Sequence, residues 1–136
     1  MRVKLDAGAF PPTRGHATDA GLDIMSPVNE TIGPGGSAVF RTGVHIELPP
    51  NTCGVLVSKS GLNTKLDLTT TGLIDEGYDG EIVVKMYNHG KKYVDIRRGD
   101  KITQLIVIPC LYEPVEIVDE IQAGERGSDG FGSTGR

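Results

Sequence analysis

An acidic and an aromatic residue stand inside a glycine-rich stretch in the middle of the chain, Gly72–Gly80. Asp75 directly follows an apolar triplet, and Tyr78 comes three residues later. Glycines let the backbone turn sharply and let a ligand approach it closely. A carboxylate beside a flat ring on such a turn can activate a water molecule over a bound ligand. Tight turns favour Gly and Asp in any case, so the stretch by itself also fits an ordinary hairpin with a solvated acid.

The elements that must position this stretch are short β-strands. Apolar residues recur with a period of two in four places: Val44–Leu48, Val55–Ser58, Ile82–Tyr87 and Val115–Ile117. This alternation predicts half-buried strands. Turn signals lie between them: Gly33–Gly36, Pro49–Asn51, Asn88–Gly90 and Arg98–Asp100. The N-terminal Met1–Leu5 is predicted as a further strand, and the one helix expected is a turn or two near Ser60–Lys65, capped by Ser58 or Ser60.

Composition supports an all-β fold. Aromatic residues make up only 5% of the 136 residues and Trp is absent, so the core must be built from Val, Ile and Leu, which favour strands. Nineteen glycines and eight prolines indicate many turns. We expect a single domain over residues 1–136, a jelly-roll-like sandwich or barrel with at most one short helix. Its β core is expected at 1–121 and a glycine-rich C-terminal arm at 122–136.

Charge and hydropathy exclude several classes of protein. The net charge is −4 and no basic run is present, which argues against a nucleic-acid partner. No apolar run approaches the roughly 18 residues of a membrane span, and the N-terminus lacks the apolar core of a signal peptide, so a cytoplasmic location is expected. Cys53 and Cys110 lie far apart without metal-ligand spacing, which predicts buried free thiols in a reducing compartment rather than a zinc site.

The last fifteen residues have a composition of their own. The segment 122–136 is rich in Gly and has Ser and Thr near its end. Phe131 is its only large apolar residue. Such a segment cannot bury enough surface to fold alone, so one interpretation is a disordered terminus. The other is a phosphate-binding arm, in which Arg126 supplies charge and Phe131 stacks on a base. Composition leaves both open.

Five segments, in this order, resemble the five motifs of the trimeric dUTPases, the deoxyuridine triphosphate nucleotidohydrolases. They are Ala20–Ile24, Ser58–Leu62, Gly72–Ile82, Arg98–Leu105 and Arg126–Gly135. Together they span nearly the whole chain. The resemblance implies a jelly-roll subunit of a homotrimer, in which each active site draws on three chains and the arm of one chain closes the site of a neighbour. The implied reaction converts dUTP and water to dUMP and pyrophosphate.

The resemblance also implies roles for the hairpin residues. Asp75 would orient the water that attacks the α-phosphorus, and Tyr78 would lie against the deoxyribose and exclude a 2′-hydroxyl. The backbone of the hairpin, including Gly72 and Ile74, would recognise uracil. Thr69–Thr71 precede the hairpin and are a further candidate contact, although consecutive β-branched residues are also simply typical of a strand.

The triphosphate would be held by residues from three other motifs. Ser60, the Gly61 amide and Gln104 would donate to phosphate oxygens. Lys59 stands where the family usually has Arg, so the planar guanidinium of Arg is replaced by the compact charge of an ammonium group. The arm would cover the γ-phosphate and the base through Arg126, Phe131, Gly132, Ser133 and Thr134. Asp129 falls where the family often has Gly and is expected to be a solvated acid.

Magnesium is the implied cofactor. Asp23 resembles the family carboxylate that holds waters of a phosphate-bound Mg²⁺, an ion that keeps most of its hydration shell. Arg98 and Asp100 are expected to form an internal ion pair. The three histidines match no role in the family and are expected at the surface or in the core.

Two other functions remain open at this point. One is a dCTP deaminase, which shares the fold, although Gly-Leu-Ile-Asp followed by Tyr resembles the dUTPase pattern more closely. The other is a nucleotide-gated regulatory protein that binds a protein partner. The presence of Asp75, Ser60 and Gln104 argues against a loss of catalysis but does not exclude such an added role.

Overall fold

The computed structural model describes residues 1–124 and residue 127. In this part of the chain the elements follow in the order β1 (Arg2–Leu5), β2 (Leu22–Met25), β3 (Glu30–Ile32), β4 (Ser37–Glu47), β5 (Thr52–Val57), α1 (Ser60–Leu66), β6 (Leu68–Ile74), β7 (Glu81–Asn88), β8 (Val94–Ile96) and β9 (Lys101–Pro109). The prediction of an all-β fold with at most one short helix is confirmed. None of the helical residues described forms a segment long and apolar enough to cross a membrane.

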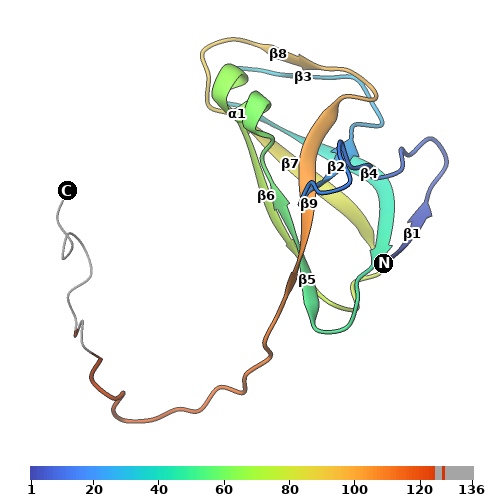
Figure 1. The fold of residues 1–136 in the computed structure, drawn as a ribbon. Coiled ribbons are helices and arrows are strands. Elements are labelled where there is room, and N and C mark those ends of the chain that lie inside the picture. Colours follow the sequence, from blue (N-terminus) through green and yellow to red (C-terminus); the bar gives the residue numbers. More distant parts are fainter. Residues whose placement is uncertain (125–126, 128–136) are drawn as a thin grey trace.

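Seven strands form one curled antiparallel sheet, in the order β1-β4-β7-β6-β5-β9-β2. The remaining strands, β3 and β8, pair with each other as a two-stranded ribbon near α1 (Figure 1). The helix and the β6–β7 hairpin lie at opposite ends of the curled sheet (Figure 1). This arrangement separates two sets of candidate site residues, as described below.

The buried core is mostly aliphatic, with Phe40 among its members. The alternation expected along 44–48 and 82–87 is confirmed: in β4 and β7 every second residue is buried, including Phe40 and Val84, which are fully shielded from solvent. All four predicted turns connect strands, and the Gly33–Gly36 turn is closed by a 3.0 Å bond from the Gly36 amide to the Gly33 carbonyl.

The strand expected at Val115–Ile117 is not formed. The last strand ends at Pro109, and Val115 and Ile117 are 91% and 95% exposed on a segment that leads away from the body (Figure 1). Alternation supplies an apolar face, but a strand also needs a neighbour for its backbone hydrogen bonds. The described part of this chain offers none to the segment.

The predicted helix is present, but it is capped differently. Lys59, not Ser58 or Ser60, is the N-cap residue, and no side-chain bond caps the helix. The Ser58 hydroxyl instead donates to the Thr70 carbonyl and accepts from the Thr70 amide. Ser58 therefore extends the contact between β5 and β6 by one residue, and the helix ends at Asp67, which has a left-handed backbone (φ 54°).

Candidate active site

A slot opens between β6 and β7 at the hairpin end of the sheet. The two strands pair only from Leu68 to Thr70 on β6, whereas β5 continues to pair with β6 as far as Ile74. Beyond Thr70 the facing edges of β6 and β7 therefore lack each other as partners. A pocket of about 340 Å³ lies at this split, lined by residues of both strands and by Asp75 and Tyr78. Unpaired strand edges present alternating N–H and C=O groups, which a flat polar ligand can satisfy.

Asp75 and Tyr78 lie at the mouth of this slot. The Tyr78 amide donates to the Asp75 carbonyl (3.2 Å), and the Tyr78 hydroxyl donates to the Glu81 carbonyl (3.0 Å). The ring lies directly over Gly80, where an added Cβ would sit 2.4 Å from the ring carbon Cζ. Gly80 is therefore required for the position of the ring, while 47% of Tyr78 remains exposed to a ligand.

Gly72 and Ile74 occupy the β6 wall of the slot. The Gly72 backbone abuts Leu56, with an added Cβ only 3.1 Å from the Leu56 Cδ1 atom. The Ile74 side chain is buried in the core, so only its backbone can face a ligand. Of the candidate threonines, Thr70 is buried and its hydroxyl has no hydrogen-bond partner among the described residues, and Thr69 contacts His89 Nε2 at 2.6 Å.

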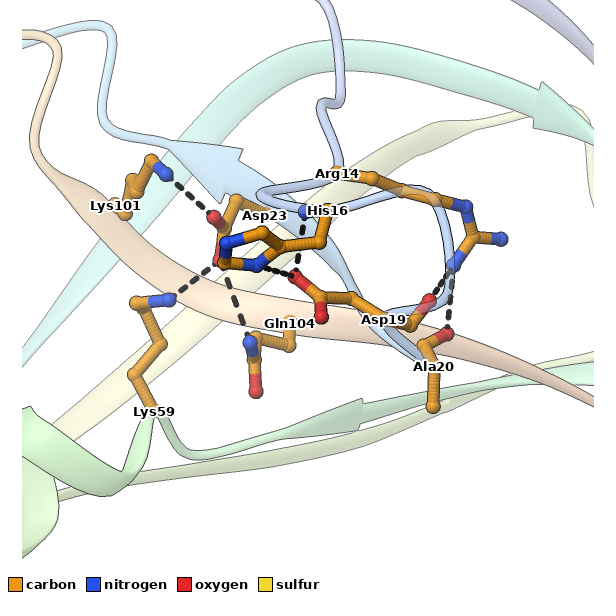
Figure 2. Close-up of polar contacts among 8 residues, drawn as sticks. All are labelled: Arg14, His16, Asp19, Ala20, Asp23, Lys59, Lys101 and Gln104. Atoms are coloured by element: carbon orange, nitrogen blue, oxygen red, sulfur yellow. Dashed lines mark hydrogen bonds and ion pairs between the residues drawn. The ribbon is translucent and has the colours of Figure 1, made fainter.

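A second cluster surrounds Asp23 near the helix end of the sheet (Figure 2). The Lys59 ammonium donates to Asp23 Oδ1 (2.5 Å), and the Lys101 ammonium lies 2.7 Å from Oδ2. Gln104, directly across the β2–β9 ladder, donates to Oδ1 at 3.5 Å. The structure thus brings together three of the predicted residues, Asp23, Lys59 and Gln104.

The electrostatics of this cluster favour an ionised Asp23. Only 4% of the residue is exposed, and burial opposes ionisation. The hydrogen bonds and charges of Lys101 and Lys59 outweigh burial and hold the pKa of Asp23 below its ordinary value. An ammonium group has three donors, so each lysine can bind Asp23 and a further anion at the same time.

Ser60 and Gly61 begin α1 beside this cluster. Both are exposed, and a Cβ added at Gly61 would meet no atom within 4 Å, so the space over this backbone is open. Amide groups of a first helical turn have no partner within the helix. With Lys59 and Gln104 they form a set of donors suited to phosphate oxygens.

Asp75 and the Asp23 cluster lie apart within one chain. On β5, Val57 stands opposite Gln104, and Gly54 stands opposite Ile74, the residue before Asp75. The next position along this ladder sets Cys53 opposite Asp75. Cys53 and Val57 are four residues apart, so at about 3.3 Å per residue Asp75 and Gln104 are separated by about 13 Å along the strand direction. A site that uses both therefore needs more than one chain or a long ligand.

The residues around Asp23 fit a hydrated metal ion rather than a directly bound one. No group of three or more metal-ligating side chains occurs in the described ranges, and the side chains that contact the Asp23 carboxylate are two lysines and Gln104. Asp23 Oδ2 retains a lone pair beyond its bond to Lys101, which is enough to accept a metal-bound water. Two neighbouring ammonium groups disfavour a bare cation, so the ion would have to arrive with phosphates.

Sequence reasoning missed two residues, one in the Asp23 cluster and one that contacts the hairpin. Lys101 reaches Asp23 because β2 and β9 are neighbours, and His45 contacts the hairpin through the Asp79 carbonyl (2.9 Å). Strand alternation does not reveal which strands are neighbours, so nothing local signalled either contact.

The prediction of an ion pair between Arg98 and Asp100 was wrong. Arg98 stacks over Phe10, and the Asp100 carboxylate accepts the Arg97 amide.

The predicted arm residues Arg126, Phe131, Gly132, Ser133 and Thr134 lie outside the described residues, as does Asp129. Their roles remain predictions.

Comparison with known proteins places this antiparallel β protein in a family. A family model described as dUTPase matches residues 9–135. The chain is 44% identical to the deoxyuridine 5′-triphosphate nucleotidohydrolase of Gloeothece citriformis, over 98% of this chain and 94% of that protein. It is 40% identical to the mitochondrial enzyme of that name from Homo sapiens, over 98% of this chain and 54% of that protein.

Solved structures agree with these sequence matches. The dUTPase of Staphylococcus bacteriophage 80alpha, solved with dUpNHpp, superposes with a TM-score of 0.93 at 31% identity and covers 99% of this chain and 98% of its own. A dUTPase variant from phage phi11 of S. aureus, described with a structural Mg(II) ion, gives a TM-score of 0.83 at 29% identity, covering 90% of this chain and 98% of that chain. The chain belongs to the dUTPase family.

Proposed function

We propose that this protein is a dUTP diphosphatase, which hydrolyses dUTP to dUMP and pyrophosphate. The observation that carries the proposal is the slot between β6 and β7, where unpaired backbone edges lie beside Asp75 and Tyr78. Family membership and the names of the relatives support the same reaction.

The slot suits uracil because the backbone provides donors and acceptors in a fixed order. Cytosine reverses part of the donor and acceptor pattern of uracil, so buried groups would be left unpaired at a cost of about 1–3 kcal/mol each. Tyr78, fixed over Gly80, would lie against the deoxyribose and reject a 2′-hydroxyl by steric clash.

Asp75 acts in this proposal on the attacking water. Its carboxylate is exposed at the mouth of the slot, where it can accept a hydrogen bond from a water aligned with the α-phosphorus. Lys59, Ser60, the Gly61 amide and Gln104 bind the phosphates. Asp23 would hold a phosphate-bound Mg²⁺ through water, and that ion would supply positive charge to the phosphates.

The proposal includes a homotrimer with shared active sites. Because Asp75 and the Asp23 cluster lie about 13 Å apart along β5, a complete site would combine the slot of one chain with the phosphate-binding cluster of another. The arm, with Arg126, Phe131, Gly132, Ser133 and Thr134, would close the site of a neighbour.

The test is pyrophosphate release from dUTP, dTTP, dCTP and UTP, each with Mg²⁺ and with excess chelator. The proposal expects fast, metal-dependent turnover of dUTP alone. Release of ammonia from dCTP would instead identify a deaminase. A folded protein that binds dUTP without turnover would indicate the nucleotide-gated regulatory protein.

A further inference from the structure

Two cysteines that are far apart in sequence lie on the same face of neighbouring strands. Cys53 on β5 stands opposite Ile108 on β9, and the Cys110 amide continues the ladder with a 2.9 Å bond to the Asn51 carbonyl. Residues two apart on a strand point to the same side of a sheet. Cys110 is therefore the diagonal neighbour of Cys53 on one face.

The same register places Asp75 on the other side of Cys53. Gly54 pairs with Ile74, so the next position along the β5–β6 ladder sets Cys53 opposite Asp75. A pocket of about 730 Å³ is lined by both cysteines together with Asp75, Glu76 and Tyr112. The cysteine pair thus adjoins the carboxylate that the proposed function places at the reaction.

The two thiols differ in exposure, and the Cys110 thiol donates to the Ile108 carbonyl (3.9 Å). A hydrogen bond with Cys110, and then burial, raises the pKa of the Cys53 thiol above its ordinary value. Cys53 is buried at 8% exposure, whereas Cys110 is partly exposed just beyond the end of β9. A small oxidant in the pocket would meet Cys110 first.

We propose that Cys53 and Cys110 form a reversible disulfide beside Asp75, closed by low-molecular-weight disulfides such as oxidised glutathione. The Cys110 thiolate attacks one sulfur of oxidised glutathione, which breaks its S–S bond, forms a mixed disulfide and releases one glutathione. The Cys53 thiolate then attacks Cys110 Sγ and releases the second. Two protein thiols are oxidised, and one oxidised glutathione is reduced to two thiols.

Closing this bond must move the chain. Diagonal neighbours in an antiparallel pair have Cα atoms about 7–8 Å apart, whereas a disulfide requires about 4.4–6.8 Å. Cys110 lies outside β9, so the shift falls on Cys110 and the residues after it. Tyr112 is one of these, and its hydroxyl donates to Glu76 Oε2 (2.7 Å). The shift therefore reaches the residue next to Asp75.

The test oxidises the assembled protein with oxidised glutathione and maps the products by mass spectrometry. The expected result is the loss of both free thiols, a peptide containing Cys53 joined to one containing Cys110 within one chain, and full reversal by dithiothreitol. The inference is overturned by a stable glutathione adduct on Cys110 with Cys53 still reduced, by cross-links between chains, or by two unreacted thiols.

Two variants locate the chemistry. In Cys110→Ser, Cys53 should stay reduced because it is buried. In Cys53→Ala, Cys110 should take up one glutathione and keep it, because the resolving thiol is absent. Rapid modification of Cys53 in Cys110→Ser would contradict the assigned order of attack.

The effect on turnover rests on the proposed function and is measured separately. Oxidised wild-type protein should hydrolyse dUTP several-fold more slowly than reduced protein, with recovery in dithiothreitol, and Cys110→Ser should not respond to oxidised glutathione. Unchanged turnover in fully cross-linked protein would contradict the coupling to Asp75. The cross-link itself is scored by mass, so its result does not depend on whether dUTP is the substrate.

Discussion

At the scale of single residues, Asp75 is distinguished by what it lacks. No described group forms a hydrogen bond with its carboxylate, whereas Asp23 is held by two lysines and Asp79 contributes its carbonyl to His45. A carboxylate kept exposed beside a ligand pocket is available to bind a water. Asp23, in contrast, organises the cations around it.

Replacement of Asp75 by Asn tests this role. Asp75→Asn should lower dUTP turnover by roughly 10²-fold or more while dUTP binding stays near normal, because the water loses its acceptor and the fold loses nothing. Turnover assays and calorimetric binding measure the two effects. Asp79→Asn, on the same hairpin, is the matched control and should keep most of its turnover. Near-normal turnover in Asp75→Asn would remove this residue from the mechanism.

Gly80 permits a second test, of sugar selection. Gly80→Ala would place a methyl group 2.4 Å from Tyr78 Cζ, so the ring must move off the slot. The expected result is a weaker preference for dUTP over UTP, measured as the ratio of the two kcat/KM values. Tyr78→Phe keeps the ring and loses only the bond to the Glu81 carbonyl, so it should retain the preference. Equal selectivity in wild type and Gly80→Ala would show that Tyr78 does not select the sugar.

At the scale of elements, His45 on β4 connects the β6–β7 hairpin to Asp6, the residue that follows β1. Its Nδ1 faces the Asp79 carbonyl (2.9 Å) and its Nε2 faces the Asp6 carboxylate (3.1 Å). Neither oxygen can donate, so only the doubly protonated ring satisfies both. The hydrogen bonds to the Asp79 carbonyl and then to Asp6 raise the pKa of His45, although burial and Lys4 oppose this. A further acidic residue, Glu81 on β7, stands opposite His45 in the β4–β7 ladder.

This tie predicts a dependence of stability on pH. Because the folded-state pKa of His45 lies above its unfolded value near 6.5, the folded state binds more protons, and the stabilisation is lost as pH rises through the folded pKa. The difference in free energy of unfolding between wild type and His45→Gln should therefore shrink from pH 6 to about pH 9. Urea unfolding at fixed protein concentration measures it. A difference that grows with pH would show that the neutral ring is the bound form.

Local patterns in the sequence predicted what depends on local geometry. Alternation located β4, β5 and β7, and Asp75 with Tyr78 could be singled out because one hairpin carries both. The partners of Asp23 and Cys53 could not be found in this way. Lys101 and Cys110 reach them through strand neighbours and register, which an alternation pattern leaves undefined. Val115–Ile117 shows the opposite failure, since alternation predicted a strand for which residues 1–124 offer no neighbouring strand.

At the scale of the whole molecule, the sheet divides the candidate residues between its two ends. Asp75 directly follows β6 at the hairpin end, whereas Asp23 contacts Lys59, the N-cap of α1, and Gln104. The segment after β9 also leaves from the hairpin end, and its exposed apolar residues include Leu111, Val115, Ile117 and Ile121. Incomplete site geometry and uncovered apolar side chains are both accounted for if copies of the chain assemble.

Shared sites predict that two inactive variants restore activity to each other. In a trimer refolded from equal amounts of Asp75→Asn and Gln104→Ala chains, every mixed trimer contains one site with a wild-type Asp75 from one chain and a wild-type Gln104 from another. With random assembly, activity should recover to about a quarter of the wild-type level, because roughly three quarters of the trimers are mixed and each restores one site in three.

The matched control mixes Asp75→Asn with the double variant, which lacks both groups and should restore nothing. Recovery absent from the first mixture, with mixed trimers verified by native mass spectrometry, would mean that Asp75 and Gln104 act within one chain, and the separation of the two clusters along β5 would then have to be bridged by movement of the hairpin.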